Sequence, residues 1–326
     1  MRAKNLAKYI YHYSGVEKLM LRFLRNSKTP LLLTMVYHRV CPSMDSYEYM
    51  GVPADVFEAH IKFIKDNFEV VTMTDGLDLL REGKPKVYAA INLDDGYMDN
   101  YTHAFPIIKK YGLSATVFLA TDFIDKYHLF WWDEVFQIMR NAGQKGACAK
   151  PEDVIRDAYR AIEINDLLMN RKDSEIKDFV NNLKKQYQIN KETAPNQMLG
   201  WKEIREMAGA GINFGSQTKT HKNLCLLEDS EIRKELMDSK LVLEEKLGAK
   251  KIGFCYPYGK HDDRIKDIVR DTGFNYARTC IKGPNSKDID RFSLRSIDVS
   301  FVLNMALFTS SIAFHSFKDS WRVSGT

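Results

Sequence analysis

The feature that most constrains the fold is a repeated alternation between short apolar runs and longer amphipathic segments. The apolar runs are continuous, which is typical of parallel strands buried on both faces. They lie at 31–37, 68–73, 87–93, 115–120, 212–215, 251–256, 274–279 and 292–299. Segments with helical spacing of apolar residues lie at 53–66, 100–111, 201–208, 228–247 and 262–272. Seven or eight strand-then-helix units favour an α/β fold, a TIM-like (β/α) barrel, over an open sheet, although the spacing leaves closure of the barrel open.

One interval interrupts this alternation. Between about residues 122 and 200 no strand pattern is visible, and charged helix-forming residues dominate. Helical spacing predicts two surface helices there, at 153–169 and 172–187. We interpret the interval as a helical insertion after the fourth strand, entered through the cluster Phe130-Trp131-Trp132. Two roles stay open for this cluster: packing of the insertion onto the barrel, or a wall on which a sugar ring stacks.

Positive charge is concentrated at the N-terminus. The net charge of the chain is +5, but residues 1–28 carry seven basic side chains and one acidic one, so the rest of the chain is close to neutral. Apolar residues recur at helical spacing in this segment, which predicts an amphipathic arm of one or two helices, divided near Ser14-Gly15. We therefore expect an arm at 1–28 and a barrel at 29–326. Peripheral membrane association through the arm is one expectation, and a helix packed on the barrel is the alternative. A neutral barrel gives no reason to expect nucleic-acid binding.

The cysteines and the apolar segments bear on the cellular compartment. The five cysteines, at 41, 148, 225, 255 and 280, are odd in number and scattered, without a Cys-x-x-Cys pair. This pattern argues against a disulfide framework or a structural zinc site. No run approaches the roughly 18 apolar residues of a membrane span, and no signal-peptide core is visible at the N-terminus. We expect a cytoplasmic protein, at the inner face of the membrane if the arm binds lipid.

Polar side chains follow four of the expected strands. His38 follows the first strand, Asp94-Asp95-Gly96 the third, the segment 216–221 the fifth and the segment 256–259 the sixth. Reactive groups of a parallel barrel lie at the carboxyl ends of its strands, so we expect these residues to meet at one mouth.

The adjacent carboxylates of Asp94 and Asp95 are the most informative pair. Like charges in contact raise one pKa unless a cation or a proton intervenes. A divalent metal would stabilise both carboxylates and also activate water. The alternative is an Asp-Gly turn in which an aspartate caps the next helix. Alone, the other polar positions are weaker signals, because a histidine such as His38 or His221 often has only a structural role.

Taken together and in this order, these segments resemble the motifs of the polysaccharide deacetylase family, also known as the NodB-homology domain or carbohydrate esterase family 4. The family's Thr-Phe-Asp-Asp-Gly segment corresponds to residues 92–96, and its Gly-Ser-His-Thr-x-x-His segment to residues 215–221. Residues 256–259 resemble its Pro-Tyr-Gly segment, and residues 35–40 resemble the first strand of its Tyr-His subgroup. The similarity extends from about residue 31 to residue 299, interrupted by the insertion.

The resemblance implies a deformed (β/α) barrel and a metal-dependent amidohydrolase. Its expected reaction removes the N-acetyl group from an N-acetylhexosamine of a glycan, oligosaccharide or glycolipid precursor. Carried over residue by residue, Asp94 is the general base, and Tyr258 offers a backbone N–H to the oxyanion. The expected metal ligands and substrate-binding residues complete the site: Asp95, His221 and Gln217 for the metal, and Pro257, Gly259 and Trp132 for the substrate.

The chain departs from the family pattern in three places. Gln217 stands where the family has its first metal histidine, and an amide oxygen is a weaker ligand without charge. Zinc is the first expectation for the metal, with another, harder divalent ion as the alternative. The family's C-terminal Leu-x-His motif is missing, and His315 has a poor context, so His38 is the expected general acid. Near Arg295 and Asp298 the tryptophan of the family's charge-tuning segment is also missing.

Two alternatives to this deacetylase remain open from the sequence. The first is a degenerate member that binds carbohydrate without hydrolysing it, which Gln217 and the missing acid motif would suit. The second is a metal-dependent hydrolase of another C–N bond, because one fold can serve several chemistries. The intact Asp94-Asp95 pair favours an enzyme, since a binding protein gains nothing from two adjacent carboxylates.

Overall fold

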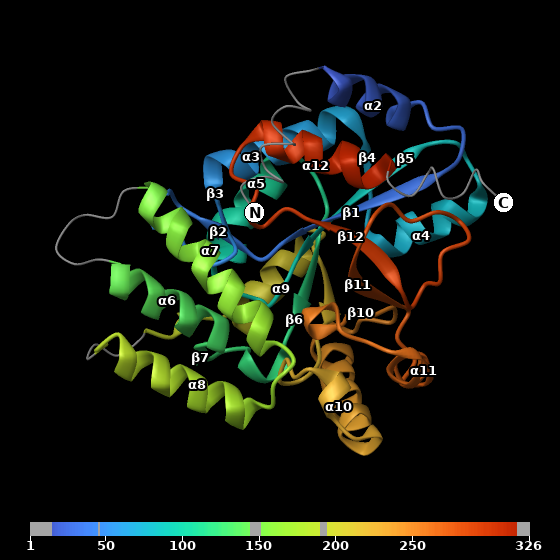
Figure 1. Ribbon diagram of the computed structural model, residues 1–326. Coiled ribbons are helices and arrows are strands. Elements are labelled where there is room, and N and C mark those ends of the chain that lie inside the picture. Colours follow the sequence, from blue (N-terminus) through green and yellow to red (C-terminus); the bar gives the residue numbers. More distant parts are fainter. Residues whose placement is uncertain (1–14, 45, 144–150, 190–193, 318–326) are drawn as a thin grey trace.

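A closed ring of seven parallel strands forms the centre of the protein (Figure 1). The computed structural model describes residues 15–44, 46–143, 151–189 and 194–317. The ring closes because β1 pairs with both β12 and β5. In order, its strands are β1 (Leu31–Tyr37), β12 (Leu294–Asp298), β11 (Tyr276–Lys282), β10 (Gly253–Cys255), β9 (Asn213–Ser216), β6 (Thr116–Leu119) and β5 (Val87–Leu93). A short strand, β4 (Glu69–Val70), adds to β5 outside the ring. The barrel predicted from the sequence is confirmed.

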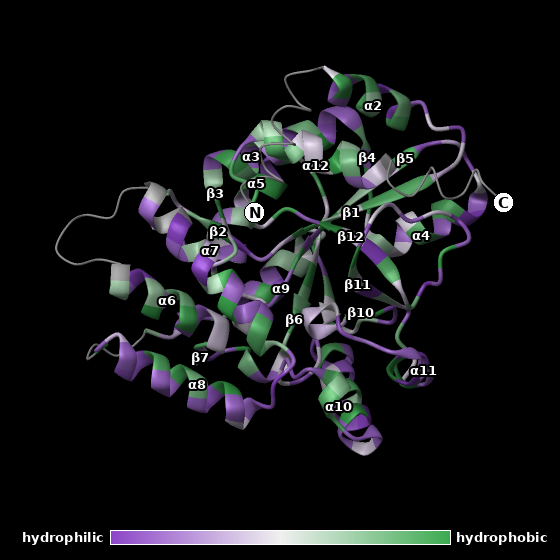
Figure 2. Ribbon diagram, in the orientation of Figure 1, coloured by the Kyte–Doolittle hydropathy of each residue, from purple (hydrophilic) through white to green (hydrophobic). Residues whose placement is uncertain are grey.

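Side chains of the barrel strands alternate between two cores. Leu33 and Ala89 belong to the main core, which lies between the barrel and its helices. Leu32 and Tyr88, their neighbours along the strands, belong to a second cluster with residues from four other strands of the ring. Side chains from six strands of a closed ring can meet only inside it, so this cluster fills the barrel. Burial on both faces is why the strands read as continuous apolar runs, and β5 and β6 are coloured hydrophobic along most of their length (Figure 2).

Most expected helices are present near their predicted bounds. They are α3 (Ala54–Asn67), α9 (Trp201–Gly209), α10 (Asp229–Leu247), α11 (Asp263–Asp271) and, after a π-helical turn at Asn100–Ala104, α5 (Phe105–Lys110). Short 3₁₀ turns lie at Thr121–Phe123, Leu224–Leu226 and Pro257–Gly259, and β2 (Arg39–Cys41) forms a parallel pair with β3 (Gly51–Pro53).

Outside the interval at 122–200, two described helices were not predicted, α4 (Met73–Glu82) and α12 (Met305–Phe317). The apolar run at 68–73 extends into α4, which hides the point where the strand ends. The Thr72 hydroxyl accepts the N–H of Asp75 at 3.1 Å and so caps this helix. The apolar side of α4 belongs to the cluster inside the barrel. α12 is buried on nearly all sides, so its sequence lacks the usual polar face.

Three further helices occupy the interval without strand pattern. They are α6 (Trp131–Gly143), α7 (Pro151–Leu168) and α8 (Asp173–Gln186), and two-residue antiparallel strands, β7 (Tyr127–His128) and β8 (Asn196–Gln197), close the interval at its base. The two predicted surface helices correspond to α7 and α8, and α6 was not predicted. The three helices share a core of their own, which includes Phe136, Ala161 and Val180. The division of the chain into arm, barrel and insertion domains stays a prediction.

The described part of the N-terminal arm is α2 (Val16–Arg25), which packs on α12 (Figure 1). Leu21 and Leu24 belong to the main core, and the buried carboxylate of Glu17 accepts a hydrogen bond from the Ser310 hydroxyl at 3.0 Å. The expected helix in residues 1–14 lies outside the described residues. Over the ranges that the structure describes, no helix combines the length and the apolar character needed to cross a bilayer.

The packing of α2 gives a stability prediction. Leu24 is 4% exposed and Leu19 on the same helix is 54% exposed. We expect Leu24→Ala to lower the free energy of unfolding by about 2–5 kcal/mol, because the substitution leaves a cavity in the main core. Leu19→Ala serves as the control and should change it by less than about 0.5 kcal/mol. Urea denaturation of both variants measures the difference, and equal effects would mean that α2 does not contribute to the core.

Candidate active site

The register of β1 and β5 brings two candidate catalytic residues together. The two strands pair residue by residue from Leu31 with Val87 to Tyr37 with Leu93. His38 and Asp94 each come one residue later, and the Asp94 N–H donates to the Tyr37 carbonyl at 2.9 Å. The His38 Nε2 lies 3.8 Å from the Asp94 Oδ2, and its Nδ1 is hydrogen-bonded to the Ser300 hydroxyl at 2.7 Å. The imidazole is thereby oriented toward the carboxylate.

The second carboxylate faces a different histidine. The Asp95 Oδ1 lies 3.3 Å from the His221 Nε2, and both side chains are buried. The backbone N–H of Asp95 donates to the Gln217 Oε1 at 3.0 Å. Burial raises the pKa of Asp95, but the hydrogen bond and charge of His221, the charge of His38 and the Gln217 amide outweigh it, so the pKa lies below its usual value. Asp95 is therefore a carboxylate at neutral pH.

Backbone strain is concentrated in these motifs. Seven non-glycine residues have a positive φ in the described part of the chain, and four of them are Asp95, Thr218, His221 and Tyr258, with φ between 58° and 72°. A left-handed conformation costs a non-glycine residue about 1–2 kcal/mol. Such strain persists where the surroundings enforce it and is typical of functional sites. Neither Asp94 nor Asp95 caps a described helix through its side chain, so the structure does not show the capping turn that was the alternative for this pair.

Tyr258 and its flanking residues form one wall beside His221. The Tyr258 ring centroid is 4.9 Å from that of His221, and its hydroxyl accepts the indole N–H of Trp131 at 3.1 Å. Burial raises the pKa of Tyr258 far above its usual value, so the phenol stays protonated. Gly259 has φ 67°, and a Cβ there would lie 2.6 Å from the Cys280 Cβ. Only glycine fits this turn, and Pro257 is buried before it.

Trp132, from the insertion, packs against the His221 ring. It is 4% exposed, its ring centroid is 4.9 Å from that of His221, and its indole N–H donates to the Tyr97 hydroxyl at 3.0 Å. The Tyr97 hydroxyl in turn donates to the buried Asp133 at 2.8 Å, as does the Asn196 amide at 2.9 Å. Packing of the insertion against the site therefore describes Trp132 better than stacking on a sugar, and the neighbouring Trp131 is the more accessible ring.

Arg278 is a site residue that the sequence analysis missed. It lies on β11 opposite Cys255 of β10, is fully buried, and points its guanidinium above the Phe118 ring, inside the barrel. Its Nη2 donates to the Asp94 Oδ2 and lies 2.7 Å from the Cys255 Sγ. Burial lowers the pKa of Arg278, but the charge of Asp94 more than offsets this, so the side chain stays a cation. An arginine within the apolar run 274–279 was the available signal.

The donor set fits a metal ion in part. Among the described residues no group of three His, Cys, Asp or Glu side chains is placed to hold a metal. Asp95 and His221 do fit, because ligands about 2.0–2.1 Å from a tetrahedral zinc lie roughly 3.3 Å apart, which is the separation of their donor atoms. The buried Nδ1 of His221 also lacks a protein partner in the described part of the chain. The Gln217 oxygen, the expected third donor, already accepts the Asp95 N–H, so the site has two strong donors.

Comparison with known proteins defines the class of this fold and site. Residues 81–277 match the family model for polysaccharide deacetylases. This match spans more than half of the chain, and the chain therefore belongs to the polysaccharide deacetylase family, whose members deacetylate acetylated glycans. The Tyr-His subgroup stays a prediction.

Individual relatives agree with this class. YxkH of Bacillus subtilis strain 168, whose own assignment as a polysaccharide deacetylase is provisional, is 24% identical over 281 residues, which cover 85% of this chain and 75% of that protein. The Streptococcus pyogenes deacetylase PplD in complex with acetate has a TM-score of 0.59 at 17% identity, covering 86% of this chain and 98% of that one. IcaB from Ammonifex degensii has a TM-score of 0.59 at 19% identity, covering 87% and 96%. At these identities the structural similarity establishes the fold.

The buried Asp133 predicts a pH-dependent stability. Burial raises its pKa to about 7, against the opposing charge of Arg39 and the hydrogen bond from Tyr97. An unfolded aspartate has a pKa of about 3.9, so folding favours the protonated form. The stability from this group is fully present below about pH 4 and is lost as the pH rises through about 7. The asparagine of an Asp133→Asn variant resembles the protonated aspartate and does not ionise. The free energy of unfolding of this variant should therefore fall less than that of the wild type between pH 5 and pH 8.

The expected difference is about 1–4 kcal/mol, because each pKa unit corresponds to about 1.4 kcal/mol. Urea denaturation across this pH range measures it. Asp263→Asn on α11, whose side chain is almost fully exposed, is the control and should keep the pH dependence of the wild type. Parallel curves for the wild type and Asp133→Asn would mean that Asp133 is ionised throughout.

The pair of Arg278 and Asp94 gives a further stability prediction. Arg278→Met leaves the Asp94 carboxylate buried without its cation, and breaking a buried ion pair in this way costs about 3–5 kcal/mol. Arg81→Met breaks the exposed pair with Asp78 and should cost less than about 1 kcal/mol. Denaturant unfolding at pH 7 compares the two. A small effect of Arg278→Met would show that Asp94 does not depend on this guanidinium.

Proposed function

We propose that this protein is a metal-dependent hydrolase that removes the N-acetyl group from an N-acetylhexosamine of a glycan, oligosaccharide or glycolipid precursor. One observation carries the proposal beyond family membership. The adjacent carboxylates of Asp94 and Asp95 face two different histidines, His38 and His221, at one mouth of the barrel. This arrangement supplies a proton-transfer pair beside a pair of metal donors.

Asp95 and His221 would hold the divalent ion, with Gln217 as the proposed third ligand. When bound there, the ion would polarise the acetyl carbonyl and lower the pKa of water. Zinc is the first candidate, and a harder ion is the alternative because an amide oxygen stands where an imidazole would favour zinc. The hydrogen bond from the Asp95 backbone N–H holds the Gln217 side chain beside the backbone of Asp95.

Asp94 is the proposed general base. Its Oδ2 faces Arg278 and His38, whereas its buried Oδ1 has no hydrogen-bond partner among the described residues. Oδ1 is therefore the atom that can accept a proton as the water oxygen attacks the acetyl carbon. Arg278 fixes the carboxylate from inside the barrel, so that Asp94 cannot rotate away from the mouth.

His38 is the proposed general acid. The Ser300 hydroxyl holds its Nδ1, which leaves Nε2 to donate a proton to the nitrogen as the C–N bond breaks. The products are acetate and the free amine of the sugar. The strained turn at Tyr258, shaped by Pro257 and Gly259, would present the Tyr258 N–H to the oxyanion. Trp131 with Tyr258 is the more accessible aromatic surface for the sugar, and Trp132 supports His221 from behind.

We further propose that the reaction takes place in the cytoplasm. Cys41, Cys225, Cys255 and Cys280 are free thiols in the structure. Free thiols in this number suit a reducing compartment. An intracellular glycan or glycolipid precursor is then the substrate class that such an enzyme would meet.

The assignment of Asp94 predicts a specific loss of activity. We expect purified protein supplied with Zn²⁺, Co²⁺ or Mn²⁺ to release acetate from N-acetylglucosamine oligomers or lipid-linked N-acetylhexosamines. Asp94→Asn should lower the rate at least about 100-fold, because the general base is lost, and should leave the bound metal unchanged. Asp271→Asn on the surface is the matched control. A fully active Asp94→Asn variant would disprove the base assignment, and a protein that neither binds metal nor releases acetate would favour the carbohydrate-binding alternative.

The assignment of Gln217 as a metal ligand predicts that a stronger donor at this position increases the affinity for the metal. Gln217→His should bind the divalent ion at least about tenfold more tightly, with activity retained or increased, because imidazole is a stronger donor than an amide oxygen. Gln197→His, on the exposed surface of β8, is the matched control and should leave the affinity unchanged. Isothermal titration with Zn²⁺ measures both. An affinity unchanged in Gln217→His would place residue 217 outside the ligand set and leave it as a positioning residue for Asp95.

A further inference from the structure

The helix α2 has three faces, of which only one is buried in the fold. Glu17, Leu21 and Leu24 form the buried face on α12. At 100° per residue, Leu19 and Phe23 lie on a second face with Val16, and Lys18, Arg22 and Arg25 lie on a third. Leu19 is 54% exposed and Phe23 is 62% exposed. Arg25 on the third face donates a hydrogen bond to the Asn67 side chain of α3 at 2.8 Å, and neither exposed face includes a residue of the site at the mouth.

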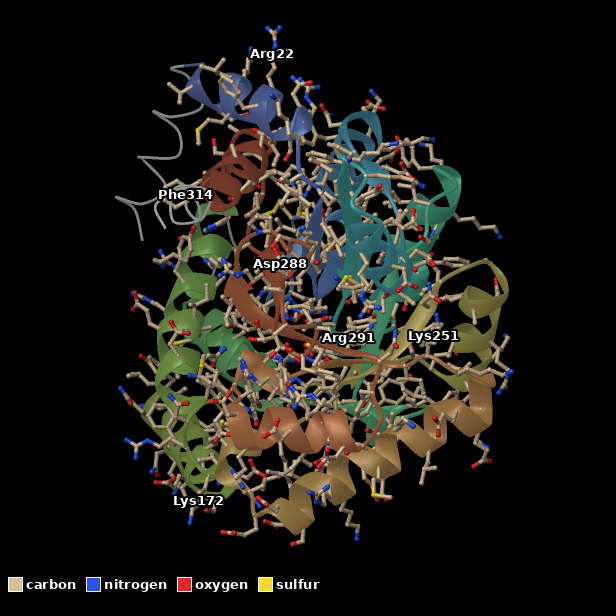
Figure 3. All side chains as sticks on the ribbon, turned by 90° about the vertical axis from the view of Figure 1, so that its right-hand side faces the viewer. Arg22, Lys172, Lys251, Asp288, Arg291 and Phe314 are labelled. Atoms are coloured by element: carbon tan, nitrogen blue, oxygen red, sulfur yellow. The ribbon has the colours of Figure 1, made fainter. Side chains whose placement is uncertain are left out.

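The exposed apolar face is a continuous row. Single exposed apolar side chains are common on protein surfaces, but a contiguous group indicates an interaction site. Leu19 and Phe23 are four residues apart, so their side chains are neighbours on the helix. Phe314 on the adjacent α12 is also exposed (Figure 3). The row therefore presents large apolar side chains at one edge of the molecule.

The third face is basic, and no acidic side chain on α2 neutralises its charge. The only acid of α2, Glu17, is buried and bonded to Ser310. Within the described residues, no ion pair joins Lys18, Arg22 or Arg25 to an acidic side chain. Arg22 points away from the body of the protein (Figure 3). A partner for this helix must therefore supply both an apolar phase and negative charge.

We propose that α2 docks this protein on an anionic lipid surface, with Leu19 and Phe23 in the apolar boundary and the basic face against the headgroups. Interfacial helices of this kind combine aromatic and aliphatic side chains with Lys and Arg. The positive charge of α2 favours a lipid surface over the other two groups that could cover this face, a second copy of the chain and residues 1–14. A second copy of the chain would bring an equal basic face into contact with this one. Residues 1–14 contain Arg2, Lys4 and Lys8 and no acid, so they would add to the charge rather than neutralise it.

The buried face makes α2 a rigid platform for this docking. Leu21 and Leu24 anchor the helix in the main core, and the bond between Ser310 and Glu17 fixes its rotation. The helix is thus already formed and oriented before it meets a membrane, so binding requires no folding step. This inference does not depend on the proposed deacetylation, because no residue of the mouth takes part.

Vesicle sedimentation of the full-length chain tests the proposal. We expect binding to vesicles of phosphatidylcholine with about one third phosphatidylglycerol, no binding to phosphatidylcholine alone, and weakening of the binding as salt is raised. Leu19→Ser/Phe23→Ser should weaken binding at least about tenfold. Lys18→Gln/Arg22→Gln should weaken it roughly twentyfold and reduce the salt dependence, since each basic residue near an anionic surface contributes about fivefold.

The matched control replaces an apolar pair of the same exposure on another helix. Met237 and Leu241 on α10 are 52% and 56% exposed, and Met237→Ser/Leu241→Ser should bind as the wild type does. All variants should keep the thermal unfolding midpoint of the wild type, because every replaced side chain is exposed. Equal binding by the wild type and both α2 variants overturns the proposal. The proposal is also overturned if the wild type binds to neither kind of vesicle. This holds whether the protein is a dimer through this row or a monomer in which residues 1–14 cover the row.

Discussion

The structure depends on how it accommodates two carboxylates that follow one another in the sequence and are both buried. Asp94 and Asp95 would repel each other if they pointed to the same side. The left-handed conformation of Asp95 turns the second carboxylate away from the first. Asp94 then meets the guanidinium of Arg278, and Asp95 meets the imidazole of His221. Each negative charge has its own positively charged or polar partner.

The separation of the two carboxylates depends on a buried cation, a strained turn and an aromatic ring of the insertion. Arg278 places a fully buried cation above an apolar layer inside the barrel, which is costly unless a carboxylate lies within hydrogen-bonding distance. Thr218 and His221 adopt strained backbone conformations, and the Thr218 hydroxyl accepts the His221 N–H at 2.9 Å to hold that turn. The insertion contributes Trp132, whose ring supports His221 from the other side. Asp95, Trp132 and Tyr258, which come from three distant parts of the chain, thus all contact the His221 imidazole.

The barrel could be predicted from the sequence because its strands carry a local signal. Burial on both faces gives continuous apolar runs, and seven of the eight predicted runs correspond to strands of the ring. α12 could not be predicted in the same way, since burial on all sides removes the polar face that marks a surface helix. α4 was missed because an apolar run crosses the point where β4 ends and the helix begins.

The site was only partly visible for a different reason. Asp94, Asp95 and His221 lie in recognisable motifs, but Arg278, the partner of Asp94, lies on a strand that does not pair with β5, and no single segment encodes their contact inside the barrel. Likewise, nothing in the sequence distinguishes a Gln217 oxygen directed to a metal from one that accepts the Asp95 N–H. Contacts across strands need the register, and the register is a property of the whole barrel.

The charges at the mouth of the barrel and the charges on α2 differ in whether the fold pairs them. At the mouth every buried charge has an internal partner, since an unpaired charge in a medium of low polarity would destabilise the fold. On α2 the basic side chains are exposed and carry no such penalty, so selection for stability alone would not require them to be paired. Their accumulation beside exposed Leu19 and Phe23 therefore has no explanation in folding. Charge that the fold leaves uncompensated is available to a partner, and an anionic surface with an apolar interior satisfies both faces of the helix at once.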